Sequence, residues 1–436
     1  QGEANLQKRH EMRASHLRAA RAGRFAHDAP FGSPDAPFLE IMVDRERLLE
    51  DALDALSTRP SADVKKPLRV RFVSDGVAEE GIDEGGVTKE FFQLLVREMF
   101  DVDDQDANAA RMFDVDDEDA NAASVDAVVK KSKSRMFAYD EESRVHWFDP
   151  AAPTDDASLA RLNLFGAALG LAIYNGVVLD VALPPFAFRR LADERHEPTL
   201  EDLRELSPSL ARGLDQLLAH EGPGSVEEVF CRSFAVDAAR RVDSEGDGGV
   251  ADAVELAPGG AHIPVTASNR EEFVRRFAVH TLVGAVAAPL DAFTRGFRRV
   301  CGGPALGLFT AEELELLIRG EPELDVAALR RVTRYDGGFS ATHPAVLAFW
   351  SVVEAMDTEE RRRLLFFTTG CDRAPVGGLG NLPFVVQRSG PDTSHLPTAH
   401  TCFNVLLLPE YASREKLRER LEVALANARG FGSSRL

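Results

Sequence analysis

A break in the chain at Gly320 and Pro322 divides a long, mostly helical region from a shorter one of mixed pattern. Glycine commonly ends helices, and proline lacks a backbone N–H and disfavours helix in the residue before it. Such a step often joins domains. The sequence therefore predicts a hinge at 321–323 between an N-terminal body, 36–320, and a C-terminal body, 324–436.

The apolar pattern of the N-terminal body is mainly helical. It predicts helices over 39–56, 200–218 and 273–297 and a buried helix over 163–179, whereas 68–73 alternates like a half-buried strand. The C-terminal body combines helices with short strands and ends on a helix capped by Ser413. We expect an α+β fold with two lobes.

Length and charge limit the classes of protein to which this chain can belong. With 436 residues, the chain has room for two or three domains and a large core. A formal charge of -20 argues against nucleic acid as a partner, because neutralising phosphates requires a basic face. The apolar run at 164–179 is interrupted by glycines, so we expect no membrane span. The first residue, Gln1, suggests a fragment of a longer polypeptide.

The four cysteines, Cys231, Cys301, Cys371 and Cys402, are widely spaced and form no C-x-x-C pair. This spacing suggests neither a zinc site nor a disulfide framework. A reducing compartment, cytoplasm or nucleus, fits such a chain best.

Two segments lie outside the globular pattern. Residues 1–35 include a basic stretch, 8–24, that is either the solvated face of a helix or a binding arm. The sequence at 99–111 recurs almost unchanged at 112–124. Neither copy has the central glycine of a calcium loop, so we interpret 99–124 as a flexible acidic insertion and expect no metal.

One cysteine stands where a polar loop meets an apolar strand. Cys402 follows His400 and Thr401 and precedes the apolar run 405–408. A thiol at such a rim can be exposed on a fixed backbone, and His400 can favour the nucleophilic thiolate if it points the same way. A free cysteine at a strand start is, however, also a common small core residue. The spacing alone leaves both interpretations open.

Several motifs resemble the catalytic domain of HECT ubiquitin ligases over about 36–436. In the C-terminal body they are Phe366-Phe367-Thr368-Thr369-Gly370, Asp372-Arg373-Ala374-Pro375-Val376-Gly377-Gly378-Leu379, Gly390-Pro391-Asp392-Thr393, and Leu396 through Asn404 to Pro409. In the N-terminal body they are 81–92, 169–175 and 256–266. Within the family the motifs look most similar to the Angelman-syndrome type, associated with a papillomavirus early protein.

The resemblance implies a mostly helical N-lobe with a small subdomain, about 190–290, that binds a ubiquitin-conjugating enzyme. It also implies an α/β C-lobe that carries the acceptor cysteine. Ubiquitin would pass to Cys402 as a thioester and then to a substrate lysine, directing proteins towards degradation. The partners would be ubiquitin, the conjugating enzyme and protein substrates, and the ligase itself would need no cofactor.

The resemblance also implies site residues, which are those at the matching positions of this sequence. Cys402 matches the family's nucleophile, with His400, Thr401 and Phe403 beside it. Phe431 matches the C-terminal phenylalanine, although five residues follow it here instead of three. The groove for the conjugating enzyme would be lined by Leu210, Leu214, Phe230, Phe273 and Phe277. Their helical spacing is equally typical of ordinary core.

Two other functions remain open. A cysteine hydrolase using Cys402 with His400 or a distant histidine would release free ubiquitin or peptide. A catalytically silent module would keep only the groove, which the intact segment 396–404 argues against. For the ligase, we expect proline at Gly320 to slow transfer without unfolding the chain.

Overall fold

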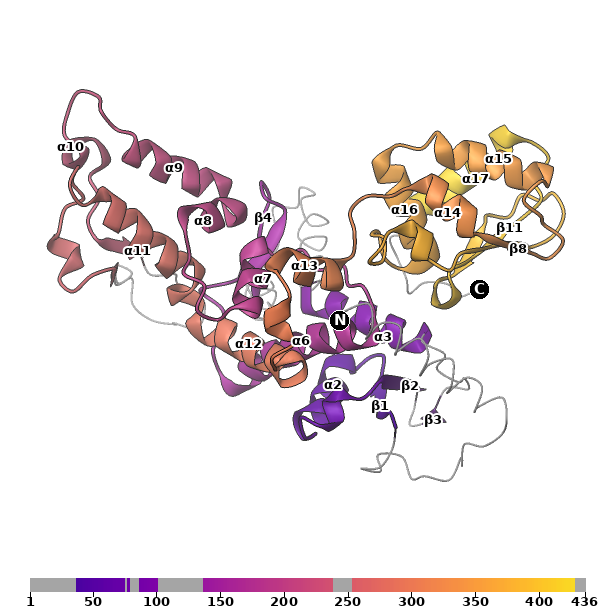
Figure 1. Ribbon diagram of the computed structural model, residues 1–436, viewed down its shortest axis with the longest axis horizontal. Helices are drawn as coiled ribbons and strands as arrows, with labels where there is room; N and C mark the ends of the chain where they lie inside the picture. Colours follow the sequence, from indigo (N-terminus) through magenta and orange to yellow (C-terminus); the bar gives the residue numbers. More distant parts are fainter. Residues whose placement is uncertain (1–36, 75–76, 79–85, 101–135, 238–252, 428–436) are drawn as a thin grey trace, which may run out of the picture.

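The protein consists of two lobes side by side, each with its own core (Figure 1). The computed structural model describes residues 37–74, 77–78, 86–100, 136–237 and 253–427. One core runs from Leu39 to Ile318 and the other from Val326 to Leu425. Helices and short strands build both lobes, which confirms the predicted α+β, two-lobed fold class.

A pair of closely packed helices, α6 (Asp156–Asn175) and α12 (Ala287–Cys301), forms the centre of the N-lobe. Glycines let the two backbones touch. A Cβ at Gly166 would lie 1.9 Å from the Phe293 carbonyl oxygen, and one at Gly296 would lie 1.9 Å from that of Asn163. The predicted buried helix is therefore real, and it begins seven residues earlier than expected.

Shorter elements pack around this pair. They are β1 (Leu39–Asp44), α2 (Leu48–Ser57), η1 (Asp63–Lys65), β2 (Leu68–Ser74), β3 (Val77–Ala78), α3 (Gly86–Phe100), β4 (Phe137–Asp140), β5 (Val145–Phe148), α7 (Pro185–Ala192), η5 (Leu306–Leu308) and α13 (Ala311–Arg319). The helix predicted over 39–56 is wrong in its first half. Leu39, Ile41 and Val43 are buried on one face of β1, which pairs in parallel with β2.

A small subdomain extends from the N-lobe at the end farthest from the C-lobe (Figure 1). Its elements are α8 (Leu200–Leu206), α9 (Pro208–Leu218), α10 (Val226–Phe230), β6 (Ala235–Asp237), β7 (Ala253–Glu255), η3 (Gly260–His262), α11 (Arg270–Leu282) and η4 (Gly284–Val286). Two predicted helices are each divided here. Pro208 starts α9 after a break at Ser207, and η4 separates α11 from α12.

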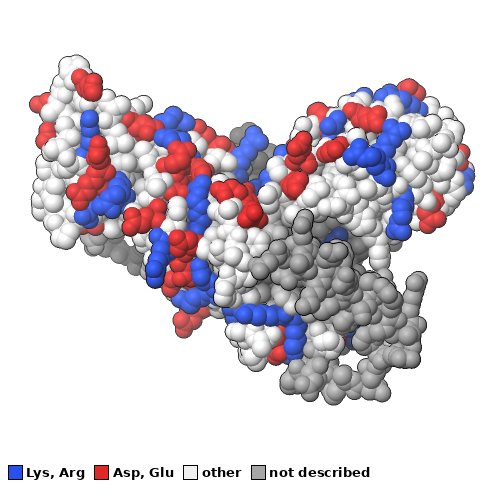
Figure 2. Space-filling model, in the orientation of Figure 1, with Lys and Arg blue, Asp and Glu red and all other residues white. Residues whose placement is uncertain are grey.

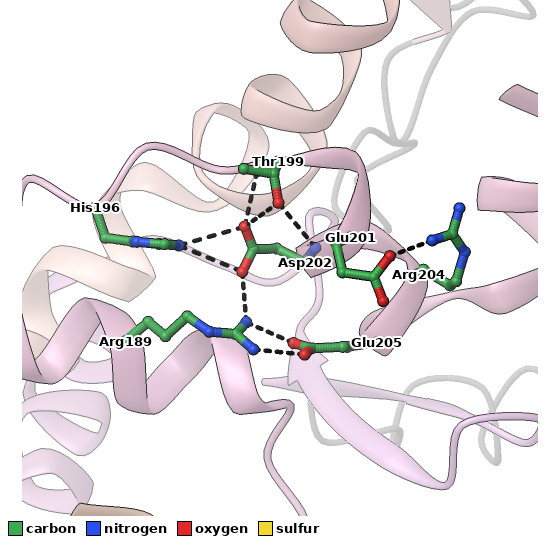
Figure 3. Close-up of polar contacts among 7 residues, drawn as sticks. All are labelled: Arg189, His196, Thr199, Glu201, Asp202, Arg204 and Glu205. Carbon is green, nitrogen blue, oxygen red and sulfur yellow. Dashed lines mark hydrogen bonds and ion pairs between the residues drawn. The ribbon is translucent and has the colours of Figure 1, made fainter. Parts of the chain in front are cut away.

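A buried carboxylate ties the base of this subdomain to α7 (Figure 3). The Asp202 side chain is only 3% exposed and accepts hydrogen bonds from the Thr199 backbone N–H at 2.8 Å and hydroxyl at 2.6 Å. The Arg189 guanidinium bridges Asp202 and Glu205, and His196 Nε2 lies 3.3 Å from both Asp202 oxygens. The network fixes where α8 leaves the body of the N-lobe.

The C-lobe packs helices against a four-stranded sheet in the order β10-β11-β9-β8. Its elements are α14 (Val326–Val332), β8 (Arg334–Asp336), α15 (Pro344–Glu354), α16 (Thr358–Thr369), η6 (Leu379–Asn381), β9 (Val385–Arg388), β10 (Thr398–His400), η7 (Thr401–Phe403), β11 (Val405–Leu408) and α17 (Arg414–Asn427). Ser413 caps α17 as predicted, because its hydroxyl accepts a hydrogen bond from Lys416 N.

The chain crosses between the lobes at Gly320, whose φ of 71° lies in the left-handed region. On the N-lobe side, Ile318 O accepts a hydrogen bond from Leu179 N, while Glu321 already pairs with Ala374 of the C-lobe core. A Cβ at Gly320 would lie 2.2 Å from the Ala374 carbonyl oxygen. Proline cannot adopt this φ. The expectation that proline at Gly320 is tolerated is therefore wrong.

Charges of both signs are interspersed over the face in view (Figure 2). Two helical stretches, Asp156–Asn175 and Arg270–Cys301, are long and apolar enough to cross a membrane by length and composition alone, although 61% of the first is buried inside the protein. The basic segment 1–35, most of the duplication at 99–124, and Phe431 lie outside the described residues.

Candidate active site

Cys402 lies in the middle of a short turn, η7, between the antiparallel strands β10 and β11. The last strand pair before the turn is His400 with Val405. Asn404 closes the turn with a φ of 53°, a left-handed conformation that asparagine tolerates better than most residues. We call residues 401–404 the acceptor turn.

Asn404 also anchors the acceptor turn to the neighbouring strand. Its side chain is buried, and Nδ2 donates a hydrogen bond to Pro383 O at 3.0 Å. Its backbone oxygen accepts a hydrogen bond from Val385 N at 3.0 Å, at the start of β9. A buried amide satisfied in this way fixes the local backbone. The position of Cys402 along the sheet edge is thereby set.

The loop that leads into β10 is held from the other side. Tyr411 donates its hydroxyl to His395 O at 2.6 Å, and burial raises the pKa of this phenol to about 12. Lys416 donates to the Asp392 carboxylate at 2.8 Å and, with the backbone N–H of Ala412, holds the pKa of Asp392 below its usual range. Both contacts link the loop to the segment that begins α17.

The residues predicted beside Cys402 differ in exposure. His400 and Phe403 are exposed, with 60% of Phe403 accessible, and Thr401 is half-buried. An imidazole two residues before Cys402 and a phenyl ring one residue after it are therefore exposed to solvent. Whether His400 acts on the thiol stays a prediction.

The five residues predicted for the conjugating-enzyme groove all lie in the small subdomain, but not all on its surface. Leu214 and Phe273 belong to the core, and the Phe273 ring packs between those of Phe234 and Phe277. Leu210, Phe230 and Phe277 are half-buried. Exposed apolar side chains that the sequence analysis did not single out are Val229, Val254 and Ile263.

Comparison with known proteins identifies this architecture. The model of the HECT-domain (ubiquitin-transferase) family matches residues 123–434. The chain belongs to the HECT family. Mouse HECTD2, a probable E3 ubiquitin-protein ligase, is 38% identical over 407 residues, which are 91% of this chain and 46% of that protein.

Two further relatives are similar to this chain over nearly the same length. Mouse HERC4 is 35% identical over 395 residues, with 91% of this chain and 33% of the relative covered. HUL4 of Eremothecium gossypii is 33% identical over 404 residues, with 91% of this chain and 43% of the relative covered. Both are described as probable E3 ubiquitin-protein ligases. The chain thus spans less than half the length of these relatives.

In this HECT chain the other three cysteines differ in exposure and surroundings. Burial raises the pKa of the Cys371 thiol to about 12, so it remains protonated and a poor nucleophile. Cys301 is half-buried against α6 and donates to Gly170 O. Cys231 is exposed, but it ends the short helix α10 in the small subdomain.

The N-lobe contributes two polar side chains to the acceptor region of the HECT fold. Gln93 Nε2 donates to Gly370 O at 2.9 Å, and Lys89 Nζ donates to Asn404 Oδ1 at 3.4 Å. Both donors lie on α3. Lys89 belongs to the family motif 81–92 and Gln93 follows it directly, but no local pattern connects either residue with Cys402.

Proposed function

We propose that this chain is the catalytic region of an E3 ubiquitin-protein transferase that carries ubiquitin as a thioester on Cys402. The supporting observation is the acceptor turn, a fixed hairpin turn with a cysteine at its centre, in a chain that belongs to the HECT family. The turn lies at the edge of a sheet whose other strands are anchored in the C-lobe core.

The reaction has two exchanges of the same acyl group. The Cys402 thiolate attacks the thioester carbonyl of ubiquitin on the conjugating enzyme, and the thiolate of that enzyme leaves. A lysine amine of the substrate then attacks the new thioester, Cys402 leaves as thiolate, and the amine loses a proton to water. Splitting one difficult transfer into two easier steps is the use of a covalent intermediate.

The fixed acceptor turn serves both steps by limiting the positions that the sulfur must search. Asn404 holds the backbone on one side and Tyr411 holds the incoming loop on the other. The exposed His400 and Phe403 offer contacts for the ubiquitin tail or for the partner enzyme. Preorganisation of this kind lowers the entropic cost of reaching the reacting geometry.

For the conjugating enzyme, we propose a surface on the small subdomain made by Leu210, Phe230 and Phe277 together with exposed Val229, Val254 and Ile263. Half-buried aromatic residues and exposed aliphatic ones in the same subdomain are suited to bind a partner. The substrates would be lysine-bearing proteins marked for degradation, in the cytoplasm or nucleus. The finer resemblance to the Angelman-syndrome type stays a prediction, since the relatives named above are of other types.

The test of the acceptor mixes activating enzyme, ATP, a panel of conjugating enzymes and ubiquitin with the chain, and resolves adducts without reductant. Wild type should form a reductant-sensitive adduct and Cys402→Ala none. Cys402→Ser should trap an adduct that survives reductant, because an ester replaces the thioester. Cys231→Ser is the matched control and should behave as wild type. Release of free ubiquitin without lysine-linked product would favour a hydrolase, and no adduct at all would favour a silent module.

The groove is tested separately by Phe277→Ala, with Phe273→Ala as its matched comparison. Loss of the half-buried Phe277 should raise the concentration of conjugating enzyme needed for half-maximal loading and should lower stability less than loss of Phe273. Loss of the buried Phe273 should lower stability by about 3 kcal/mol or more. Equal loading by wild type and Phe277→Ala would remove this residue from the groove.

A further inference from the structure

Two short stretches of chain join the small subdomain to the rest of the N-lobe. Residues 193–199 lead from α7 to α8, and residues 283–286 lead from α11 to α12. Neither stretch is α-helical, so each can bend by changing a few backbone torsion angles. Contacts that cross this joint therefore decide how freely the subdomain can turn.

An arginine of the N-lobe body holds the first helix of the subdomain (Figure 3). Arg189 lies on α7, which Phe186 and Phe188 pack into the N-lobe core. Its Nη1 donates to Glu205 Oε2 at 2.6 Å and to Asp202 Oδ1, and its Nη2 donates to Glu205 Oε1. The two carboxylates lie three residues apart on α8, so the arginine fork spans one face of that helix. The arginine side chain is 25% exposed and the carboxylates are 3% and 23% exposed, so water screens these contacts little.

A second hold comes from the turn between β4 and β5. The Ser143 hydroxyl donates to Leu206 O at 2.7 Å, at the end of α8. Asp140 shapes this turn, because its carboxylate accepts a hydrogen bond from Ser143 N at 2.9 Å. Glu142 also pairs with Arg212 of α9, but these side chains are 44% and 59% exposed, so this ion pair contributes little.

The joint clamp, which we define as Arg189 and Ser143 with the α8 groups that they contact, lies apart from the predicted groove. Leu210, Phe230 and Phe277 lie on α9, α10 and α11, beyond the joint. The clamp can thus decide where the groove faces without forming part of it. In the structure it holds the small subdomain at the end farthest from the C-lobe (Figure 1). A conjugating enzyme bound there starts at a distance from the acceptor turn.

We propose that Arg189 is a positioning residue that restrains the small subdomain, and that the joint clamp opens when the bound conjugating enzyme passes ubiquitin to Cys402. The inference rests on the proposed function, because it needs a conjugating enzyme in the groove and an acceptor in the C-lobe. Only molecules with an open clamp can bring the two together by turning the subdomain. The loading rate at saturating conjugating enzyme therefore rises with the open fraction, whereas the affinity of the groove stays the same.

Single-turnover loading of the full chain over a range of concentrations of charged conjugating enzyme separates the clamp from the groove. Glu205→Gln keeps the size of the side chain but removes its charge, so the contact with Arg189 weakens. We expect the maximal rate to rise about three- to tenfold and the half-maximal concentration to stay within about twofold. Phe277→Ala should instead raise the half-maximal concentration. Glu201→Gln is the matched control and should behave as wild type, because Glu201 pairs with Arg204 on the same helix and not across the joint (Figure 3).

A second measurement reports the angle of the subdomain itself. Cys231 is exposed on the small subdomain, and Asp291 has a 73% exposed side chain on α12. In a Cys402→Ser chain that carries spin labels at Cys231 and at Asp291→Cys, the distances between the labels should be narrowly distributed. Glu205→Gln should broaden this distribution. A purely structural role would lower the melting temperature of Glu205→Gln without raising its maximal loading rate.

Ser143→Ala removes the other hold and should change both measurements in the same direction but by less, so the test stands even if Glu205→Gln does not fold. A maximal rate that is unchanged or lower, or a distance distribution that does not broaden, would overturn the inference. A higher half-maximal concentration would also overturn it, because the clamp would then support the groove. Each of these results leaves the acceptor role of Cys402 intact. Failure of every chain to load Cys402 would overturn the proposed function and the inference together.

Discussion

Gln93 of the N-lobe donates a hydrogen bond of 2.9 Å to the carbonyl oxygen of Gly370 in the C-lobe, and a Cβ on that glycine would lie 1.9 Å from Gln93 Nε2. Gly370 ends α16 in the left-handed conformation, with a φ of 77°. The contact joins a helix of one lobe to the end of a helix in the other. It lies on the side of the C-lobe that also holds the acceptor turn.

Loosening this contact should affect loading. The small subdomain lies at the opposite end of the molecule from the C-lobe (Figure 1). If it binds the conjugating enzyme as proposed, the acceptor turn must leave α3 to reach that enzyme. We expect Gln93→Ala to speed loading roughly two- to tenfold, the equivalent of one neutral hydrogen bond. Single-turnover loading from a charged conjugating enzyme measures this rate, with the melting temperature as a check on folding. Slower or unchanged loading would show that the docked state is not an obstacle.

The buried Asp202 network should be sensitive to acid. Burial by itself would raise the pKa of Asp202, but hydrogen bonds from Thr199 and the charge of Arg189 outweigh it and lower the pKa below its ordinary value of 3.8. A lowered pKa contributes stability that is present above the ordinary value and is lost as pH falls through the folded-state value. Asp202→Asn should therefore cost about 1–3 kcal/mol near neutral pH, and less in acid.

Hydrogen exchange in α8 and α9 at several pH values measures this difference. Asp291→Asn is the control, because Asp291 also pairs with an arginine but its side chain is 73% exposed. That pair should contribute little at any pH. A gap between wild type and Asp202→Asn that stays constant into acid would contradict the assignment of a lowered pKa.

The close approach of α6 and α12 predicts that alanine at Gly296 and alanine at Gly213 have opposite effects on stability. Alanine at Gly296 would place a methyl group 1.9 Å from Asn163 O, so the helices must separate, which should lower stability by about 1–3 kcal/mol or more. Gly213 on α9 has open space around it, and Gly213→Ala should raise local helix stability by about 0.5–1 kcal/mol. Chemical denaturation of the two variants compares them directly. The prediction fails if both changes have the same sign.

Two cysteines should differ strongly in reactivity. Because burial raises the pKa of Cys371 to about 12, it remains a thiol below that pH and should react slowly with iodoacetamide at pH 8. Cys231 is exposed and should react first of these two. Timed alkylation followed by peptide mapping measures both rates in one sample. Equal rates would mean that the C-lobe opens around Cys371 in solution.

Local patterns predict helices well where a single apolar face decides the structure, as in α17, whose cap at Ser413 is also predicted. They failed at β1, because the buried alternation of Leu39, Ile41 and Val43 becomes decisive only when β2 pairs with it, about thirty residues later in the chain. Apolar spacing resumes directly after Ser207, so the pattern predicts one helix over 200–218 where the structure has two.

The candidate site was predictable only where its residues are close together in the sequence. The segment around Cys402 is continuous in sequence, so its motif could be recognised. The contact of Lys89 with Asn404 joins residues 315 positions apart and depends on how two separately folded lobes meet. Burial of Phe273 likewise depends on Phe234 packing against it from another element, which helical spacing cannot distinguish from an open groove.

The two cores share no residue, and the backbone passes between them through a single glycine-marked crossing. Damage confined to the C-lobe would then leave the small subdomain folded and able to occupy the partner enzyme. If the small subdomain binds the conjugating enzyme as proposed, a chain damaged in this way would occupy that enzyme without transferring ubiquitin, and would compete with intact chains for it.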